Sequence, residues 1–452
     1  MFYLPRYRII LSVELFYRIL EVINYVIIGI CTTAFFFQIV MILFFWLPEK
    51  HFPKAEKQAK IAVIFMAKDE EEVIGKTISA FLEGQDYPKE LFDLYVVADN
   101  CSDKTAEIAA SAGAEVLVHT DPDPKHARKA YGIQYGLSTL RSLGKGYDFY
   151  LLFDADNRAD PHYLSAMNDA YQSGVEIARP FEASSNAGQN AWTSVSAGYY
   201  LRDSFIASNF RERLHLDSML TGAGMMVADK ILEAIPNSYD CVTMAEDAEF
   251  TVRRLLKKKR VHYVSDAIVY EDQPATLKDT LSRLTRMGHG LNHLFFTKGF
   301  PLFGHFFVSG RWSNIDLFVQ IMMIPVAVLC CLWFPAYYIF YVLLHLLNAI
   351  GPEFLGGYMN IGGAYMTSEM SWLLLWDLMK MILIVLGAYL VLYPFQTWVC
   401  VLRSKKKLGL PSLKGYVSGI LLSPLFMIVY ALAITAGALS KPKWKKIKRS
   451  SE

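Results

Sequence analysis

The run Leu151-Leu152-Phe153-Asp154-Ala155-Asp156-Asn157 is an apolar segment that ends abruptly in two carboxylates. A short apolar run bounded by turn residues is typical of a buried strand, and open α/β sheets bind ligands at the carboxyl ends of their strands. Asp154 and Asp156 point the same way on an extended backbone, because side chains alternate along a strand. Two hard oxygen ligands at a sheet edge suit Mg²⁺ or Mn²⁺ held between the carboxylates and a diphosphate. A solvated turn would explain a lone Asp-x-Asp equally well, so the rest of the chain decides.

Strands alternate with helices on the N-terminal side of this run. Apolar runs at 61–67, 94–98 and 115–119 each precede a helical pattern. This alternation predicts the α/β class, with a parallel, Rossmann-like sheet. No Gly-x-Gly-x-x-Gly follows the first strand, which argues against a dinucleotide redox cofactor.

Acidic residues follow three of the predicted strands, as Asp69 with Glu70, as Asp99, and as Asp154 with Asp156. Because the carboxyl ends of parallel strands meet at one edge of a sheet, we expect these side chains to converge. Like charges packed together cost stability unless a cation or a substrate joins them. The sequence therefore predicts a binding site at this edge.

Two later segments add polar groups to the candidate site. Leu220-Thr221-Gly222-Ala223-Gly224 is glycine-rich inside a β-like segment, which indicates close backbone approach to a ligand, although a turn or bulge is the simpler interpretation. Ala245-Glu246-Asp247 begins a helix that continues to about Leu256. Acid in a first helical turn is also ordinary capping chemistry, so this cluster alone is ambiguous.

An amphipathic helix is predicted over residues 277–299. Arg283 and Arg286 lie on one face because residues three apart are neighbours on a helix. Such a pair suits phosphate oxygens or lipid head groups.

The composition indicates a membrane protein, since 53% of the 452 residues are hydrophobic and only 19% are charged. Residues 21–47 carry one charge and exceed the roughly 20 residues that cross a bilayer, so we expect a transmembrane helix there. Residues 1–20 interleave arginine with apolar residues, which predicts an amphipathic interfacial segment, although a simple flanking sequence explains the pattern equally well. From 48 to 300 the composition is that of a soluble domain.

After residue 316 the chain becomes apolar again over 316–350, 372–400 and 416–440, and we expect three to four transmembrane helices within 316–440. Basic clusters at 403–407 and in the tail 441–452 both belong on the cytoplasmic side by the positive-inside rule. That placement conflicts with a single crossing at 416–440, so one segment is expected to be interfacial or re-entrant.

Charge and cysteine usage exclude other classes. A formal net charge of +2 gives nucleic acid no electrostatic footprint. The six cysteines are scattered without a Cys-x-x-Cys spacing, which indicates apolar fillers in a reducing compartment rather than a disulfide framework or a zinc site.

Taken in order, six short motifs resemble those of the membrane-integrated family 2 glycosyltransferases, the group that contains the cellulose, hyaluronan and poly-N-acetylglucosamine synthases. They are Ala67-Lys68-Asp69-Glu70-Glu71, Ala98-Asp99-Asn100, Asp154-Ala155-Asp156, Thr221-Gly222, Glu246-Asp247 and Arg283-Leu284-Thr285-Arg286. The resemblance spans residues 58–300. It implies a GT-A (Rossmann-like) domain in the cytoplasm, inserted between transmembrane helices.

The resemblance also implies roles for these residues. The nucleotide-sugar donor would contact Lys68, Asp69, Glu70, Asp99, Lys129, Asp154, Arg283 and Arg286. Asp154 and Asp156 would hold Mg²⁺ or Mn²⁺, and Thr221 with Gly222 would meet the acceptor. Asp247 would be the general base, with Glu246 beside it in the catalytic motif.

Two positions depart from the family pattern. Ala245 replaces the threonine of the family's Thr-Glu-Asp, and Met287 stands where the family's Gln-x-x-Arg-Trp has its tryptophan. Relatives place that tryptophan under the acceptor sugar, so its loss puts processivity and linkage in doubt.

The favoured interpretation is an inverting hexosyltransferase that uses UDP-glucose or UDP-N-acetylglucosamine. It would polymerise a β-linked exopolysaccharide such as a β-glucan and extrude it across the cytoplasmic membrane, with the bilayer and an accessory membrane or export subunit as partners and no nucleic acid. The alternative is a single transfer to a lipid-linked acceptor in place of a growing glycan. A third interpretation is a catalytically silent membrane scaffold or sugar-nucleotide sensor.

Overall fold

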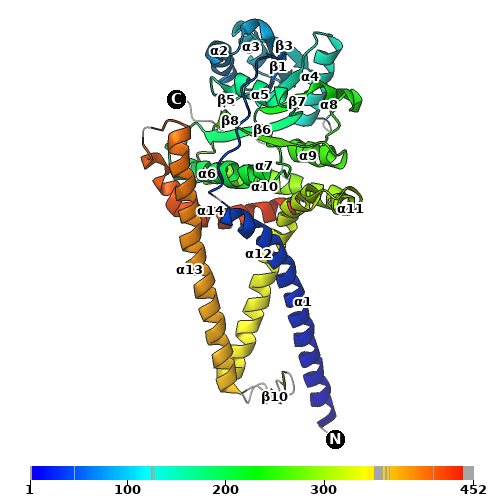
Figure 1. Cartoon of the computed structure of the whole chain (residues 1–452). Coiled ribbons are helices and arrows are strands. Elements are labelled where there is room, and N and C mark those ends of the chain that lie inside the picture. The colour runs from blue at the N-terminus through cyan, green and yellow to red at the C-terminus, as the bar shows by residue number, and fades with distance from the viewer. Residues whose placement is uncertain are drawn as a thin grey trace.

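The computed structural model describes residues 3–44, 46–123, 126, 128–350, 360–361, 364–365, 367–410 and 412–440. An α/β domain occupies one end of the molecule, and three long helices extend from one side of it (Figure 1). The predicted basic tail, 441–452, lies outside the described residues.

The centre of the domain is an eight-stranded sheet with the order β3-β2-β1-β4-β7-β6-β8-β5. Its strands are β1 Ile61–Ala67, β2 Phe92–Asp99, β3 Glu115–His119, β4 Phe149–Asp154, β5 Arg158–Ala159, β6 Ile177–Ser184, β7 Met225–Ala228 and β8 His262–Glu271. Every residue of β1 is buried, and Phe65 on β1 stacks on Phe153 of β4 with ring centroids 5.0 Å apart. Burial on both faces explains why these strands are continuous apolar runs.

The predicted parallel pairing holds for part of the sheet, including β6 with β8, and is wrong for β5 and β7, which pair antiparallel with their neighbours. The strands β3, β2, β1 and β4 are parallel neighbours, but β7 pairs antiparallel with both β4 and β6. The chain reverses before β7 at Gly222 and Gly224, whose φ angles are +77° and +67°. Glycine adopts such angles without steric cost, so the glycine-rich segment makes a turn rather than a strand.

The helices of the domain surround this sheet. They are α2 Ile74–Gly84, α3 Thr105–Ser111, α4 Lys129–Ser142, α5 Tyr163–Gln172, α6 Ala191–Arg202, α7 Asn209–Arg213, α8 Asp229–Glu233, α9 Glu246–Leu256, α10 Leu277–Leu294 and α11 Phe300–Ser309. Short 3-10 turns lie at Lys89–Leu91, Pro236–Ser238 and Lys414–Tyr416, and π-helical turns lie at Asp203–Ser208 and Phe295–Gly299. The amphipathic helix predicted over 277–299 thus consists of α10 and the π-helical turn after it.

Four helices are long and apolar enough to cross a membrane, within Leu15–Phe36, Trp312–Ile350, Ser368–Lys407 and Lys414–Ala438. They belong to α1 Tyr3–Leu43, α12 Trp312–Ile350, α13 Ser368–Lys407 and α14 Val417–Ala438. The helix α1 has no break at the predicted boundary between residues 20 and 21. A two-residue pair of strands, β9 Asn360–Ile361 and β10 Ala364–Tyr365, lies between α12 and α13.

The helices α12 and α13 converge far from the domain and diverge toward it, and α14 lies across the opening between them (Figure 1). Glycines bring α14 close to the domain. The Gly419 amide donates to Ser194 Oγ of α6 at 2.8 Å, and a Cβ at Gly437 would overlap the Thr285 carbonyl oxygen of α10. The expectation that one apolar segment is interfacial or re-entrant stays a prediction, and α14, which lies crosswise to α12 and α13, is the segment to test.

Candidate active site

A cavity of about 1320 Å³ extends from the carboxyl ends of β1, β2 and β4 to the helices α12, α13 and α14. Its lining includes every predicted site residue except Asp69, namely Lys68, Glu70, Asp99, Lys129, Asp154, Asp156, Thr221, Gly222, Glu246, Asp247, Arg283 and Arg286. Residues from six motifs spread over more than 200 positions therefore meet in one space.

Lys129, the first residue of α4, connects two of the acidic motifs. Its Nζ lies 2.5 Å from Asp154 Oδ1 and 3.7 Å from Glu246 Oε1. Burial alone would lower the pKa of Lys129, but the carboxylates of Asp154 and Glu246 outweigh it and raise that pKa. The ammonium group therefore stays charged and partly balances the acidic cluster.

Glu246 and Asp247 occupy the first turn of α9 inside the cavity. Burial raises the pKa of Glu246 to about 7, against the opposing effect of Lys129. Burial also raises the pKa of Asp247. A carboxyl whose pKa moves toward neutrality is suited to accept a proton from a substrate hydroxyl.

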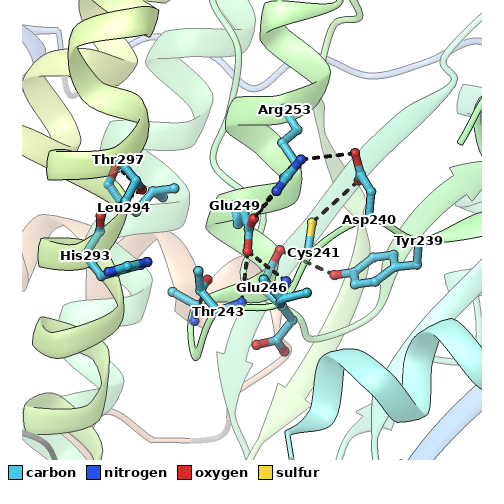
Figure 2. A network of polar contacts seen from close by, with 12 residues as sticks. Tyr239, Asp240, Cys241, Thr243, Glu246, Glu249, Arg253, His293, Leu294 and Thr297 are labelled. Atoms are coloured by element: carbon cyan, nitrogen blue, oxygen red, sulfur yellow. Dashed lines mark hydrogen bonds and ion pairs between the residues drawn. The ribbon is translucent and has the colours of Figure 1, made fainter. Parts of the chain in front are cut away.

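The loop before α9 is held by Glu249. Its Oε2 accepts hydrogen bonds from the backbone amides of Val242 and Thr243, both at 2.9 Å. Its Oε1 accepts from Arg253, which also reaches Asp240 (Figure 2). This network fixes the loop and thereby the start of the helix that carries Glu246 and Asp247.

Asp99 and Asp69 have different surroundings. His119 Nδ1 lies 2.8 Å from Asp99 Oδ1, so β3 orients the carboxylate at the end of β2. Asp69 has a φ of +53°, and its carboxylate accepts hydrogen bonds from the amide and hydroxyl of Ser102. Asp69 thus holds two loops together, and it does not line the cavity, so the structure does not bring this predicted donor contact to the site.

Three residues of the cavity lining were not predicted from the sequence. They are Arg179 and Glu182 on β6 and Asp203, which follows α6. The Thr221 hydroxyl donates to Glu182 Oε1, and Arg179 Nη2 lies 3.1 Å from the same carboxylate. Burial raises the pKa of Glu182 to about 8. Arg179 also pairs with Asp203 at 2.8 Å. The signal in the sequence is the pair of charges inside a strand-length apolar run, because such residues are rarely buried unpaired.

The two arginines of α10 both line the cavity but differ in their ion pairs. Arg283 Nη2 lies 2.7 Å from Glu271 Oε1. Arg286 forms no ion pair within the part of the chain that the structure describes, and its Nε is buried without a hydrogen-bond partner. Burial and the neighbouring Arg283 lower the pKa of Arg286. Arg286 is partly buried, and the carboxylates of Asp154 and Glu246 act on it without forming an ion pair. A partly buried cation without a direct partner is costly, so this position favours an anionic ligand.

Asp154 and Asp156 have the oxygen chemistry that a divalent cation requires, and both line the cavity. The ammonium of Lys129 beside Asp154 shows that positive charge is attracted to this position. A second group of possible metal ligands consists of Asp69, Cys101 and Asp103. Each offers one ligand atom, and these atoms lie within 4.8 Å of one another. Acidic loops of that kind are common without a metal, whereas Asp154 and Asp156 open onto the cavity.

Comparison with known proteins identifies the domain. Residues 58–290, just over half of the chain, match the family described as "Glycosyltransferase like family 2". A probable glycosyltransferase of Bacillus subtilis, YdaM, is 25% identical over 255 residues, which cover 54% of this chain and 58% of that protein. The beta-monoglucosyldiacylglycerol synthase of Synechocystis is 26% identical over 229 residues, covering 48% and 44%. The chain therefore spans about half the length of these curated relatives.

Among solved structures, the mannosyltransferase PcManGT from Pyrobaculum calidifontis, in complex with GDP-Man and Mn²⁺, aligns over 92% of this chain and 98% of its own. The identity is 15% and the TM-score is 0.49. The match to the family and the mixed sheet confirm the predicted GT-A-like fold.

Proposed function

This chain belongs to glycosyltransferase family 2, and on that premise we propose that it transfers one sugar from a UDP-sugar to a lipid acceptor at the cytoplasmic membrane. The single observation that supports this most strongly is the cavity itself. It connects Asp154, Asp156 and Asp247 with apolar side chains of the membrane helices, among them Ile324, Ala327 and Val385. A lipid that keeps its chains in the bilayer can present its head group along such a path.

The donor would bind at the carboxyl ends of β1, β2 and β4. The nucleoside would lie against Lys68, Glu70 and Asp99, which line this end of the cavity. The positive charges of Lys129 and Arg286 would neutralise the departing nucleoside diphosphate. A divalent cation held by Asp154 and Asp156 would supply further charge neutralisation there.

Asp247 would act as general base. It would take the proton of the acceptor hydroxyl as the oxygen forms its bond to C1 of the sugar. The bond between C1 and the diphosphate oxygen breaks, and the electron pair leaves with the nucleoside diphosphate. Attack in line with that bond inverts the configuration at C1.

The names of two relatives agree with a lipid acceptor, since both are beta-monoglucosyldiacylglycerol synthases. Glucose is accordingly the first donor sugar to test, with N-acetylglucosamine second.

A processive synthase is the second candidate, because five tyrosines line the cavity. These are Tyr199, Tyr200, Tyr389, Tyr393 and Tyr430, and such rings combine an apolar face with a polar tip. Other aromatic residues of α12 and α13 do not line the cavity, namely Trp333, Tyr337, Tyr338, Tyr341, Trp372 and Trp376. The missing tryptophan after Arg286 also favours single transfer.

The deciding experiment is to reconstitute the purified protein in vesicles with labelled UDP-glucose or UDP-N-acetylglucosamine and Mn²⁺. We expect a product that extracts into organic solvent and carries one sugar per lipid. Long chains protected in the vesicle lumen would establish the processive synthase instead. Donor binding without any turnover would favour the silent scaffold or sensor.

A further inference from the structure

Another arginine of the cavity lining, Arg202, lies near α13. It is the last residue of α6, and it reaches toward α13. Its Nη1 donates to the Tyr393 hydroxyl and its Nη2 donates to Gln396 Oε1 at 3.1 Å. Its guanidinium carbon also lies 3.7 Å from the centroid of the Tyr393 ring. Both partners of Arg202 are uncharged.

The charge of Arg202 is not balanced by a carboxylate. Within the described residues it forms no ion pair, and its Nε is buried without a hydrogen-bond partner. The next residue, Asp203, is engaged by Arg179 at 2.8 Å. Removing a guanidinium from water without an opposite charge costs free energy that an incoming anion would return.

The surroundings of Arg202 are those of a lipid rather than of a nucleotide. Val385 and Tyr389 on α13 and Met427 and Tyr430 on α14 line the same part of the cavity. Arg202 lies near the neutral side chains of Cys400, Tyr199 and Tyr389, and the carboxylate of Asp203 acts on its charge. The groups that act electrostatically on Arg286 include Asp154 and Glu246. Arg202 and Arg286 therefore lie in different parts of the cavity.

We propose that Arg202 binds the phosphate of an anionic membrane lipid and that this lipid is the acceptor whose hydroxyl receives the sugar. The inference rests on the proposed function, because it names the head-group chemistry of the lipid acceptor. The planar guanidinium matches phosphate geometry, and the apolar side chains of α13 and α14 accommodate the first part of the acyl chains. Diacylglycerol, which has no phosphate, would lack this contact.

The test compares two lipids with the same acyl chains, phosphatidylglycerol and diacylglycerol, in polyether-detergent micelles that contain no other phosphate. Transfer from labelled UDP-glucose and direct binding of a fluorescent phosphatidylglycerol are both measured. Arg202→Gln should weaken phosphatidylglycerol binding and raise its KM by about 10- to 100-fold, the range expected for lost hydrogen bonds to a charged group. The KM for UDP-glucose should stay unchanged, and Arg202→Lys should recover part of the loss.

Arg403→Gln is the matched control. Arg403 is on α13, and its guanidinium carbon lies 4.8 Å from the centroid of the Phe205 ring, but it does not line the cavity. The KM of the Arg403→Gln variant for phosphatidylglycerol should equal that of the wild type. Glycerol 3-phosphate should compete only weakly, because it has the phosphate without the chains.

The outcomes separate the two proposals. If neither lipid is glycosylated while phosphatidylglycerol binding still depends on Arg202, the lipid site stands and the proposed function fails. If lipids are glycosylated but diacylglycerol serves as well as phosphatidylglycerol, or Arg202→Gln changes neither binding nor KM, the anionic-lipid inference is overturned. If glycerol 3-phosphate competes as well as phosphatidylglycerol does, the site recognises a soluble phosphate, and the inference that its ligand is a lipid is overturned.

Discussion

At the scale of single residues, the carboxylates that end β4 and begin α9 carry the proposed chemistry. Asp156→Asn removes one hard oxygen ligand, which should weaken metal and diphosphate binding together. We expect sugar transfer in Mn²⁺ to be abolished while the melting temperature stays that of the wild type. Asp266→Asn, at an exposed carboxylate paired with His51, is the control that should keep full activity. Full turnover of the wild type in EDTA would contradict the metal site.

Asp247→Asn tests the base. The amide keeps nearly the same shape but cannot take a proton, so we expect UDP-sugar binding to persist and the rate to fall about 10²- to 10⁴-fold. Binding is followed by calorimetry and the rate by single-turnover transfer. A variant that binds donor and transfers sugar at the wild-type rate would remove Asp247 from this role.

The raised pKa of Glu182 predicts that the stability of the folded domain depends on pH. Its pKa is about 8 in the fold against 4.5 for an ordinary glutamate, so the folded state binds this proton more tightly than the unfolded state. The group therefore favours the fold at low pH, and this contribution is lost as pH rises from about 4.5 to 8. The melting temperature of Glu182→Gln, relative to the wild type, should be higher at pH 8.5 than at pH 5.5. A difference that does not change with pH would refute the raised pKa.

The sequence predicts where a residue lies when its motif is local, but not when a site is assembled from distant segments. Asp154, Asp156, Glu246 and Asp247 are placed by the end of a strand and the start of a helix, which the hydrophobic pattern predicts. Glu182 and Arg202 sit inside β6 and α6, where only the folded chain brings them to the cavity. Asp69 has the same local pattern as Asp99, yet its positive φ turns it toward Ser102.

At the scale of elements, α14 is attached to the domain through glycines that admit no side chain. A Cβ at Gly437 would overlap the Thr285 carbonyl oxygen, whereas a Cβ at Gly387 on α13 would meet nothing within 4 Å. Gly437→Ala should therefore cost about 1–3 kcal/mol through overpacking. Gly387→Ala is the matched control and should be neutral or slightly stabilising, because alanine favours a helix. Equal melting temperatures for the two variants in detergent would argue against the close packing of α14 on α10.

Hydropathy could not predict the orientation of α14, because a helix that crosses a bilayer and one that lies against a domain can have the same composition. The information lies in the small residues that allow approach, Gly419 toward α6 and Gly437 toward α10. The antiparallel β7 was missed for a similar reason, since the direction of a short strand depends on the turn at Gly222 and Gly224.

At the scale of the whole molecule, the basic end of α13 and the domain should share one side of the membrane. Lys405, Lys406 and Lys407 close α13, and the positive-inside rule places them in the cytoplasm. A cysteine at exposed Glu83 should react with a membrane-impermeant maleimide in inside-out vesicles. A cysteine at Trp372, which is 50% exposed near the distal start of α13, should react only in right-side-out vesicles. The reverse pattern would invert the proposed topology.

From the course of α14 across α12 and α13 (Figure 1), we infer that α14 lies along one face of the bilayer, which has a mechanical consequence. A helix that lies along one face of a bilayer takes up area in that leaflet and not in the other. The two leaflets then differ in lateral pressure around each molecule, and lipids that favour curvature relieve the difference. Turnover should therefore respond to the spontaneous curvature of the host bilayer, even when the lipids compared carry identical head-group charge.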